Sequence, residues 1–143
     1  APYVVFLHAT SRADKEWPEQ NWIALGQWFA ERNFVCVLPS GNPAEHNRAL
    51  RLAQSIPNAQ SLAPGVLEEI ADLLARANAV IGVDTGLTHL ACAFDKPTVA
   101  LYCHSDPGLT GVYGSARAIN LGGIGSPPSV DAVLAAYARV LAR

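Results

Sequence analysis

The stretch Ala79-Val-Ile-Gly-Val-Asp-Thr-Gly-Leu-Thr-His-Leu-Ala-Cys-Ala-Phe94 joins a short apolar run directly to an amphipathic segment. The run Ala79–Val83 is strongly apolar, which is typical of a strand buried on both faces of a parallel sheet. The polar turn that begins at Asp84 then opens a helix that reaches Phe94. A strand that leads straight into a helix is the unit from which parallel α/β sheets are built.

The same alternation extends along the chain in both directions. Apolar runs predict strands, and longer segments with their apolar positions on one face predict helices between them. Further strands are expected at Val4–Leu7, Phe34–Leu38, Ala59–Leu62, Thr98–Tyr102 and Arg117–Leu121, and further helices from Trp17 to Asn33, Ala44 to Ser55, Val66 to Ala77 and Ser129 to Leu141.

This order of elements predicts a single α/β domain over residues 1–143. Right-handed crossovers between parallel strands give a doubly wound, mainly parallel six-stranded sheet with helices on both faces, which is a Rossmann-like fold. Ligands of such sheets bind beyond the carboxyl ends of the strands. Functional residues are therefore expected just after Leu7, Leu38, Val83 and Tyr102.

Composition supports a globular domain and disfavours several classes of function. Of the 143 residues, 50% are hydrophobic and 15% are charged, and the formal net charge is −2. No basic run is present, so no nucleic-acid partner is expected. The sequence contains neither an apolar stretch of about 20 residues that would span a membrane nor a signal peptide. Three scattered cysteines predict reduced thiols in the cytoplasm. The start in a strand, without Met, suggests a piece cut at a domain boundary.

The turn Asp84-Thr-Gly-Leu-Thr-His89 carries the strongest chemical signal. The first turn of a helix presents free N–H groups and the positive end of the helix dipole, which together attract phosphate. Gly86 lets the backbone come close to a ligand, and Thr85 and Thr88 add hydroxyl donors. This pattern predicts a diphosphate site. The alternative, that Asp84 or Thr85 merely caps the helix, is about equally compatible with the residues alone.

A second polar loop, His8-Ala-Thr-Ser-Arg-Ala-Asp-Lys-Glu-Trp-Pro18, follows the first predicted strand. Thr10 and Ser11 supply hydroxyls, and Arg12 and Lys15 supply cations that bind phosphate. Such a loop alone is compatible with an ordinary polar surface segment. Because the ends of the first and fourth strands flank the switch point of a doubly wound sheet, the two loops together predict a negatively charged ligand.

Glu45 follows the second predicted strand, where an acidic residue can accept hydrogen bonds from ribose hydroxyls. It fits equally well as a first-turn carboxylate that complements the helix dipole. The long, Gly-rich loop Tyr102–Gly114 is placed to reach over the site. Its neighbours Cys103, His104 and Asp106 have poor spacing for converging on one ion, so no metal is expected.

Other catalytic patterns are missing from the sequence. It has no G-x-S-x-G elbow, no P-loop and no G-x-G-x-x-G after the first strand, which disfavours hydrolase chemistry and ordinary NAD binding. No pair of carboxylates stands out for glycosidase chemistry. No cofactor is therefore expected.

Three motifs, in order, resemble the C-terminal domain of the lipopolysaccharide heptosyltransferases, glycosyltransferase family 9. They are His8-Ala-Thr-Ser-Arg-x-x-Lys-x-Trp-Pro18, Val83-Asp-Thr-Gly-Leu-Thr-His89 and Asp106-Pro-Gly-Leu-Thr-Gly-x-Tyr-Gly114. The resemblance covers essentially the whole chain. It is strongest to the type I enzymes, which add the first heptose to Kdo.

The resemblance implies the donor-binding half of an inverting GT-B glycosyltransferase. Its C-terminal domain binds ADP-L-glycero-β-D-manno-heptose and needs no metal of the DxD type. By the same resemblance, phosphates are held by Thr10, Ser11 and Lys15, the ribose by Glu45 and the heptose by Asp84, and the rest of the diphosphate and sugar site is formed by Thr85, Gly86 and His89. Thr88 completes the predicted donor-binding set as the second hydroxyl donor of the turn.

The resemblance also implies partners outside this chain. The Kdo-lipid A acceptor and the family's proposed general base belong to an N-terminal domain that the sequence lacks. The full protein is then expected on the cytoplasmic face of the inner membrane of a Gram-negative bacterium, and this chain is expected to bind donor without transferring heptose. The alternatives are a nucleotide-sugar 2-epimerase of the same two-domain architecture and a non-catalytic nucleotide-binding module, such as a flavodoxin-like or receiver domain.

Overall fold

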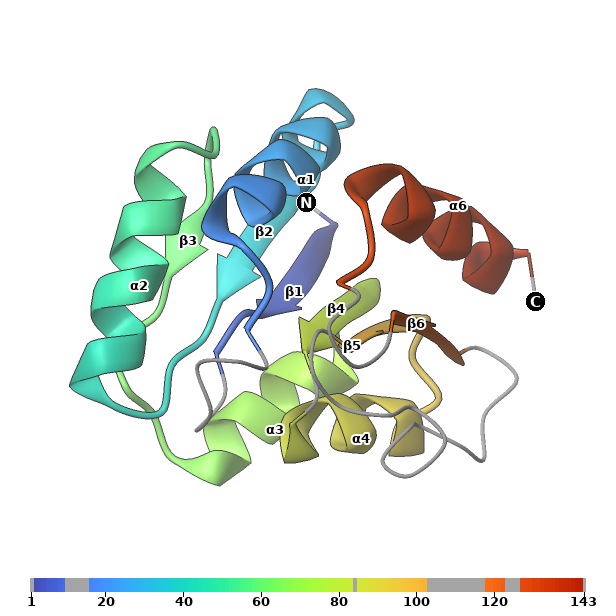
Figure 1. The fold of residues 1–143 in the computed structure, drawn as a ribbon. Helices are drawn as coiled ribbons and strands as arrows, with labels where there is room; N and C mark the ends of the chain where they lie inside the picture. The colour runs from blue at the N-terminus through green and yellow to red at the C-terminus, as the bar shows by residue number, and fades with distance from the viewer. Residues whose placement is uncertain (1, 10–15, 84, 103–117, 123–126, 143) are drawn as a thin grey trace.

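The computed structural model describes residues 2–9, 16–83, 85–102, 118–122 and 127–142 (Figure 1). Its strands are β1 (Tyr3–Leu7), β2 (Val35–Leu38), β3 (Gln60–Ser61), β4 (Ala79–Val83), β5 (Thr98–Tyr102) and β6 (Ala118–Gly122). Its helices are α1 (Glu19–Glu31), α2 (Pro43–Gln54), α3 (Leu67–Ala75), α4 (Gly86–Ala93) and α6 (Val130–Leu141).

The strands form one sheet in the order β3-β2-β1-β4-β5-β6, and every neighbouring pair is parallel. The chain winds outward from β1 to β3, crosses back to place β4 beside β1, and then winds outward in the other direction. This reversal confirms the predicted doubly wound, Rossmann-like fold. It also makes the neighbouring carboxyl ends of β1 and β4 the switch point at which such sheets bind ligands.

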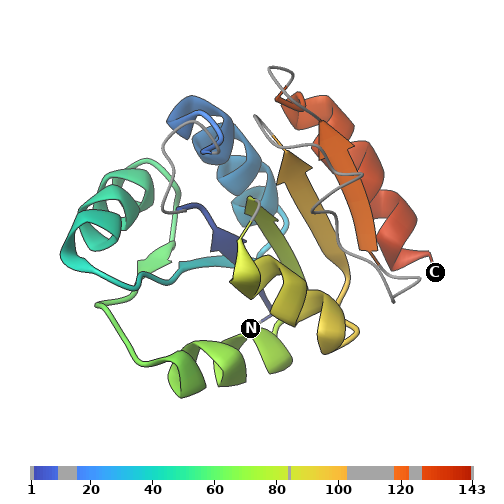
Figure 2. The ribbon, with the colours of Figure 1, turned by 60° about the horizontal axis from the view of Figure 1, so that its bottom comes forward.

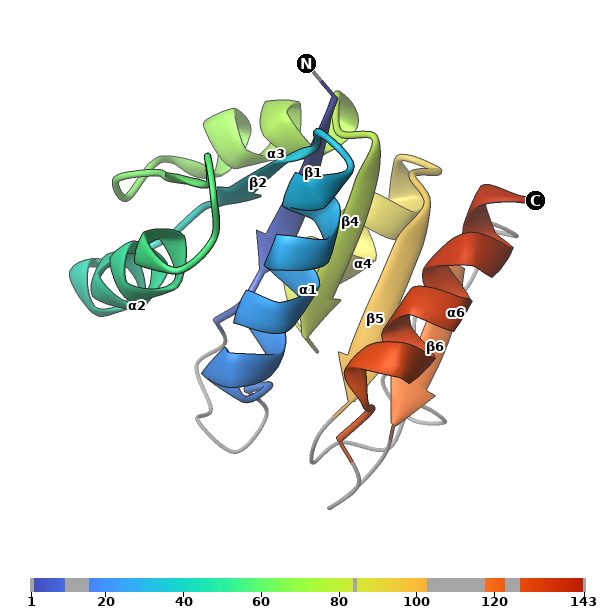
Figure 3. The same ribbon diagram turned by 90° about the horizontal axis from the view of Figure 1, so that it is seen from above.

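Helices cover both faces of the sheet, as Figure 3 shows from above. On one face, Val4 and Phe6 of β1 pack in a cluster with side chains of α1, α2 and α6. Their neighbours Val5 and Leu7 point to the opposite face and pack against α3 and α4, which lie side by side there (Figure 2). Because successive strand residues alternate between faces, a strand that is apolar at every position needs this double cover.

The aromatic residues of α1 pack against β1 and α6 in the core. Trp22 lies 4.9 Å from Phe6 between ring centroids, and Phe29 lies 5.0 Å from Tyr137 of α6. Trp17, just before the helix, packs edge-on against Trp22 at 4.9 Å. Aromatic pairs in this geometry each contribute about 0.5–1.5 kcal/mol beyond the area they bury. They fix α1, and with it the end of the connection that follows β1.

Element boundaries differ from the predicted ones by one to a few residues. Pro18 is the residue before the first turn of α1 rather than a member of it, and α4 begins at Gly86 rather than at Asp84. Asn33, predicted to stop the first helix, has a positive φ of 66° just beyond its end. Asparagine tolerates this left-handed conformation better than most residues, so the helix stop is confirmed.

Candidate functional site

The N-terminus of α4 lies at the carboxyl end of β4, beside the end of β1. Leu7 pairs with Gly82 across the two strands, so the segments that follow Leu7 and Val83 leave the sheet at neighbouring points. The carbonyl of Thr85 accepts the N–H groups of Thr88 and His89, at 3.1 and 3.4 Å. The two loops that were predicted to share a ligand, after Leu7 and after Val83, therefore start next to each other at the carboxyl end of the sheet.

The start of α4 lacks a side-chain capping hydrogen bond in the part of the chain that the structure describes. Thr85 occupies the cap position, but its side chain makes no capping hydrogen bond. Among the described residues, no acceptor faces the N–H groups of Gly86 and Leu87. Gly86 is exposed, and a Cβ added there would meet no described atom within 4 Å. Unpaired N–H groups at the positive end of a helix form an anion site, which favours the diphosphate hypothesis over a simple Thr85 cap.

Thr88 faces the sheet rather than the open end of the helix. The sequence predicts a hydroxyl donor for the ligand at this position, but the residue is only 1% exposed and its hydroxyl donates to the Val83 carbonyl at 2.7 Å. Gly82 makes room for it, because a Cβ on Gly82 would collide with the Thr88 hydroxyl and lie 2.9 Å from the Leu7 Cβ. In this structure Thr88 holds the turn, and its contact with a ligand stays a prediction.

The remaining predicted positions divide into two groups. Thr85 and His89 are half-buried at the start of α4, next to the open N–H groups. Thr10, Ser11, Arg12, Lys15, Asp84 and the loop 103–114 lie outside the described residues, so their predicted roles stay predictions.

Glu45 takes part in the cap of α2. Asn42 accepts the Glu45 N–H at 2.9 Å, and the Glu45 carboxylate accepts the Gly41 N–H at 2.8 Å and the Asn42 amide at 3.1 Å. This is the first-turn role that the sequence left open beside ribose binding. Among the described residues each carboxylate oxygen accepts one hydrogen bond, fewer than it can accept, and Glu45 lines a surface pocket of about 320 Å³ together with Ala9 and Glu16. Ribose binding by Glu45 therefore stays compatible with the cap.

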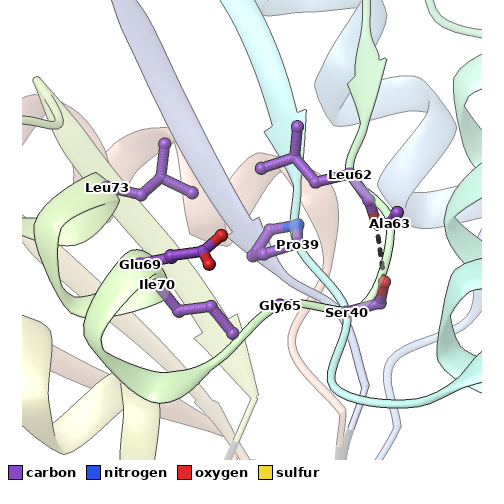
Figure 4. Close-up of a pocket in the computed structure, with 8 residues that line it drawn as sticks. All are labelled: Pro39, Ser40, Leu62, Ala63, Gly65, Glu69, Ile70 and Leu73. Carbon is purple, nitrogen blue, oxygen red and sulfur yellow. Dashed lines mark hydrogen bonds between the residues drawn. The ribbon is translucent and has the colours of Figure 1, made fainter.

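A second hollow opens at the carboxyl ends of β2 and β3. Figure 4 shows Glu69, Ile70 and Leu73 of α3 facing Pro39 and Leu62 across it. Its volume is about 250 Å³. The hydroxyl of Ser40 donates to the Leu62 carbonyl at 2.7 Å and ties the two strand ends together. A mostly apolar hollow at this edge is suited to a flat, partly apolar group such as a nucleobase.

His8 is a buried polar residue at the end of β1 whose position the sequence did not predict. It is 0% exposed, and one ring nitrogen, Nε2, lies 3.1 Å from the Pro39 carbonyl. Burial, and after it the nearby positive charge of Arg48, lower the pKa of His8 to about 4. The ring is therefore neutral near pH 7. A carbonyl only accepts, so Nε2 carries the hydrogen and donates it, which joins the end of β1 to the end of β2.

Acidification should destabilise the fold through His8. Its folded pKa of about 4 lies below the ordinary 6.5, so the unfolded chain takes up the proton first. The stabilisation is full above pH 6.5 and is lost as the pH falls toward 4. Between about pH 7 and 5.5 the free energy of unfolding should fall by about 1 kcal/mol because of this residue.

Urea unfolding at both pH values measures this loss of stability. The variant His8→Gln should lose about 1 kcal/mol less than the native chain, and an equal loss in both would contradict the assignment.

Membrane-spanning helices and metal-binding clusters are both absent from the described residues. No helix among them has the length and apolar character that crossing a membrane requires. In the same residues, no three His, Cys, Asp or Glu side chains gather closely enough to hold a metal ion.

Comparisons with known proteins place this chain in a family. A family model, glycosyltransferase family 9 (heptosyltransferase), matches residues 1–134. Lipopolysaccharide heptosyltransferase 1 of Salmonella typhimurium is 49% identical over 113 residues, which cover 79% of this chain and 36% of that protein. The chain spans about a third of the length of the curated relatives that it matches most strongly.

Solved structures agree with the sequence match. The Escherichia coli heptosyltransferase WaaC with ADP has a TM-score of 0.89 to this chain at 38% identity, covering 96% of this chain and 44% of that one. WaaC with ADP-2-deoxy-2-fluoro heptose has a TM-score of 0.80 at 38% identity, over 93% of this chain and 41% of that one.

The fold is a Rossmann-like domain whose switch point lies at the neighbouring carboxyl ends of β1 and β4. The chain belongs to glycosyltransferase family 9, the heptosyltransferases.

Proposed function

We propose that this chain is the donor-binding part of a heptosyltransferase and that it binds ADP-L-glycero-β-D-manno-heptose at the carboxyl edge of its sheet. The observation that carries the proposal is the start of α4, where the N–H groups of Gly86 and Leu87 have no acceptor among the described residues. The similarity to WaaC, solved with ADP and with an ADP-heptose analogue, supports the nucleotide and the sugar.

The donor would extend across the switch point in three parts. Its diphosphate would accept hydrogen bonds from Gly86 and Leu87 and from Thr10, Ser11 and Lys15 of the neighbouring loop. The ribose would contact Glu45, and the base would enter the hollow beside Ser40. The heptose would lie near Asp84, Thr85 and His89. A helix N-terminus and a lysine aimed at the diphosphate would also stabilise the ADP that leaves during transfer.

The acceptor half of the reaction would depend on protein outside this chain. We propose that the whole enzyme transfers heptose with inversion to Kdo of the lipopolysaccharide inner core at the cytoplasmic face of the inner membrane. The general base and the acceptor groove would belong to a second domain. This chain alone would then bind donor and transfer nothing, so a transfer assay with ADP-heptose and a Kdo acceptor should give no product. Product formed by the purified chain would contradict this division.

Glu45 should discriminate nucleotides by their ribose hydroxyls. The variant Glu45→Gln replaces a charged acceptor by a neutral one and keeps the shape of the side chain. ADP binding should therefore weaken about fivefold, which is about the difference between a charged and a neutral hydrogen bond. Binding of 2′,3′-dideoxy-ADP should not change, because that nucleotide has no hydroxyl to offer. Calorimetry with both nucleotides gives the four affinities. Equal weakening of both would assign Glu45 to the α2 cap alone. Glu68→Gln serves as a surface carboxylate control, because Glu68 is exposed on α3 and lines neither hollow.

A thermal-shift comparison of ADP, UDP and FMN tests the proposed function against its alternatives. A ligand present at ten times its dissociation constant should raise the melting temperature by about 5 °C in a domain of this size. ADP should give the largest shift. A preference for UDP would favour an epimerase of the nucleotide-sugar type, and a response to FMN alone would favour a flavodoxin-like module.

A further inference from the structure

Arg48 of α2 holds the segment that enters α1. Its Nη2 donates to the Trp17 carbonyl at 2.9 Å, and its Nη1 lies 3.3 Å from a Glu19 carboxylate oxygen and 3.5 Å from one of Glu16. The side chain is only 13% exposed. One guanidinium thus contacts three residues that lie within four positions of one another at the end of the connection from β1. Two carboxylates already share its charge, which disfavours a direct role as a phosphate ligand.

Trp17 is fixed from its other side as well. The residue is fully buried, its indole N–H donates to the Pro128 carbonyl at 2.8 Å, and its ring packs edge-on against Trp22. The Trp17 backbone is therefore held between the α6 side of the molecule, through the indole, and α2, through Arg48. Hydrogen bonds from a charged guanidinium are among the stronger ones in proteins, so the loss of this contact leaves the carbonyl poorly held.

Arg48 also connects this segment to the β2–α2 turn. It lies three positions beyond Glu45 on the same helix face, and both residues line the pocket of about 320 Å³ that Ala9 and Glu16 close from the opposite side. At the start of the connection, His8 donates to Pro39 in the same turn. The described ends of the β1–α1 connection are therefore both tied to the β2–α2 turn and α2, which carry Glu45.

From these contacts we infer that Arg48 is a positioning residue for donor binding. It sets Glu16 and Trp17, the described end of the β1–α1 connection, at the distance from α2 that the nucleotide diphosphate requires. The inference rests on the proposed function. Arg48 acts through the Trp17 carbonyl and touches no ligand atom. Its removal should therefore weaken binding of the phosphate-bearing part of the donor, and it should leave binding of the nucleoside part nearly unchanged.

The test compares ADP with adenosine on the native chain, Arg48→Met and Arg51→Met by NMR titration. Arg51 is the matched control: it lies on the same helix and pairs with Glu19 at 3.0 Å, but it is 58% exposed and its described contacts do not include Trp17. Arg48→Met should weaken ADP binding about tenfold and adenosine binding less than twofold. Arg51→Met should change both less than twofold.

The outcomes separate the inference from the function on which it rests. If the native chain binds no ADP, the proposed function fails and the inference with it. If the native chain binds ADP, two results would show that the inference is wrong. Arg48→Met could weaken ADP binding and adenosine binding equally, or it could weaken neither, and in both cases Arg48 has only a general structural role. Should Arg48→Met not fold, Arg48→Lys keeps the charge near the two carboxylates but not the paired donors. In Arg48→Lys, ADP binding should weaken about threefold and adenosine binding should not change. If Arg48→Lys binds both ligands as tightly as the native chain does, the inference is overturned.

Discussion

Replacing Gly86 by valine should weaken ADP binding about a hundredfold, which corresponds to about 2.7 kcal/mol, and should change the melting temperature by less than about 2 °C. The position is exposed at the first residue of α4, and an added Cβ meets no described atom within 4 Å. The folded chain therefore accommodates the side chain. A ligand that needs the N–H groups of this turn does not, because the valine methyl groups occupy the space in front of them.

Calorimetry with ADP and a thermal melt of the same sample give both quantities. Ala93→Val places the same side chain at the exposed other end of α4, so it controls for an effect on the helix itself. Unchanged ADP binding in Gly86→Val would remove this turn from the site. A binding loss that only parallels a large fall in melting temperature would favour the hypothesis that the turn merely caps a helix.

Lys15→Ala should weaken ADP binding ten- to a hundredfold, because a hydrogen bond to a charged group contributes about 1.5–3 kcal/mol. The prediction rests on the sequence and the family resemblance, since Lys15 lies outside the described residues. A point charge on a diphosphate also makes binding sensitive to salt, so the variant should show a shallower decline of affinity between about 50 and 300 mM NaCl.

Lys96→Ala is the control for net charge, because Lys96 precedes β5 at the opposite edge of the sheet. Calorimetry over the salt series measures both the affinity and its slope. An affinity of Lys15→Ala within twofold of the native chain would exclude Lys15 from the diphosphate site.

The fold could be predicted from the sequence because its signals are local. Runs such as Ala79–Val83 are apolar at every position, and the helices between them carry their apolar residues on one face, so both the elements and their order followed from periodicity. The parallel sheet and the switch point then followed from general rules of chain connection. The boundaries shifted by a few residues, as at Pro18 and Gly86, because capping geometry depends on backbone angles that composition does not determine.

Side-chain direction at the site was less predictable. Thr88 points into the sheet because Gly82 leaves a gap on β4, a contact between two elements that neither motif contains alone. By contrast, the cap of α2 could have been predicted. Asn42 is a favoured cap residue, and Glu45 follows it by three positions, which is the spacing of a capping box.

The anchors of the β1–α1 connection could not be predicted. His8 binds Pro39, Trp17 binds Pro128, and Arg48 binds Trp17, at sequence separations of 31, 111 and 31 residues. Contacts over such distances depend on the finished packing of the sheet and its helices. A polar residue directly after an apolar strand, as at His8, was the only local hint.

The most direct test of the account is an NMR titration of the ¹⁵N-labelled chain with ADP, followed at the backbone amides. We expect saturable shifts that are largest at Gly86 and Leu87, smaller ones near Glu45, and none at the amino ends of the strands, such as Tyr3 and Ala79. The same titration with adenosine should leave Gly86 and Leu87 nearly unmoved, since these amides are assigned to the diphosphate. Saturable shifts confined to other surfaces, or no saturable change at several millimolar ADP, would contradict the claim that the N-terminus of α4 holds the donor diphosphate.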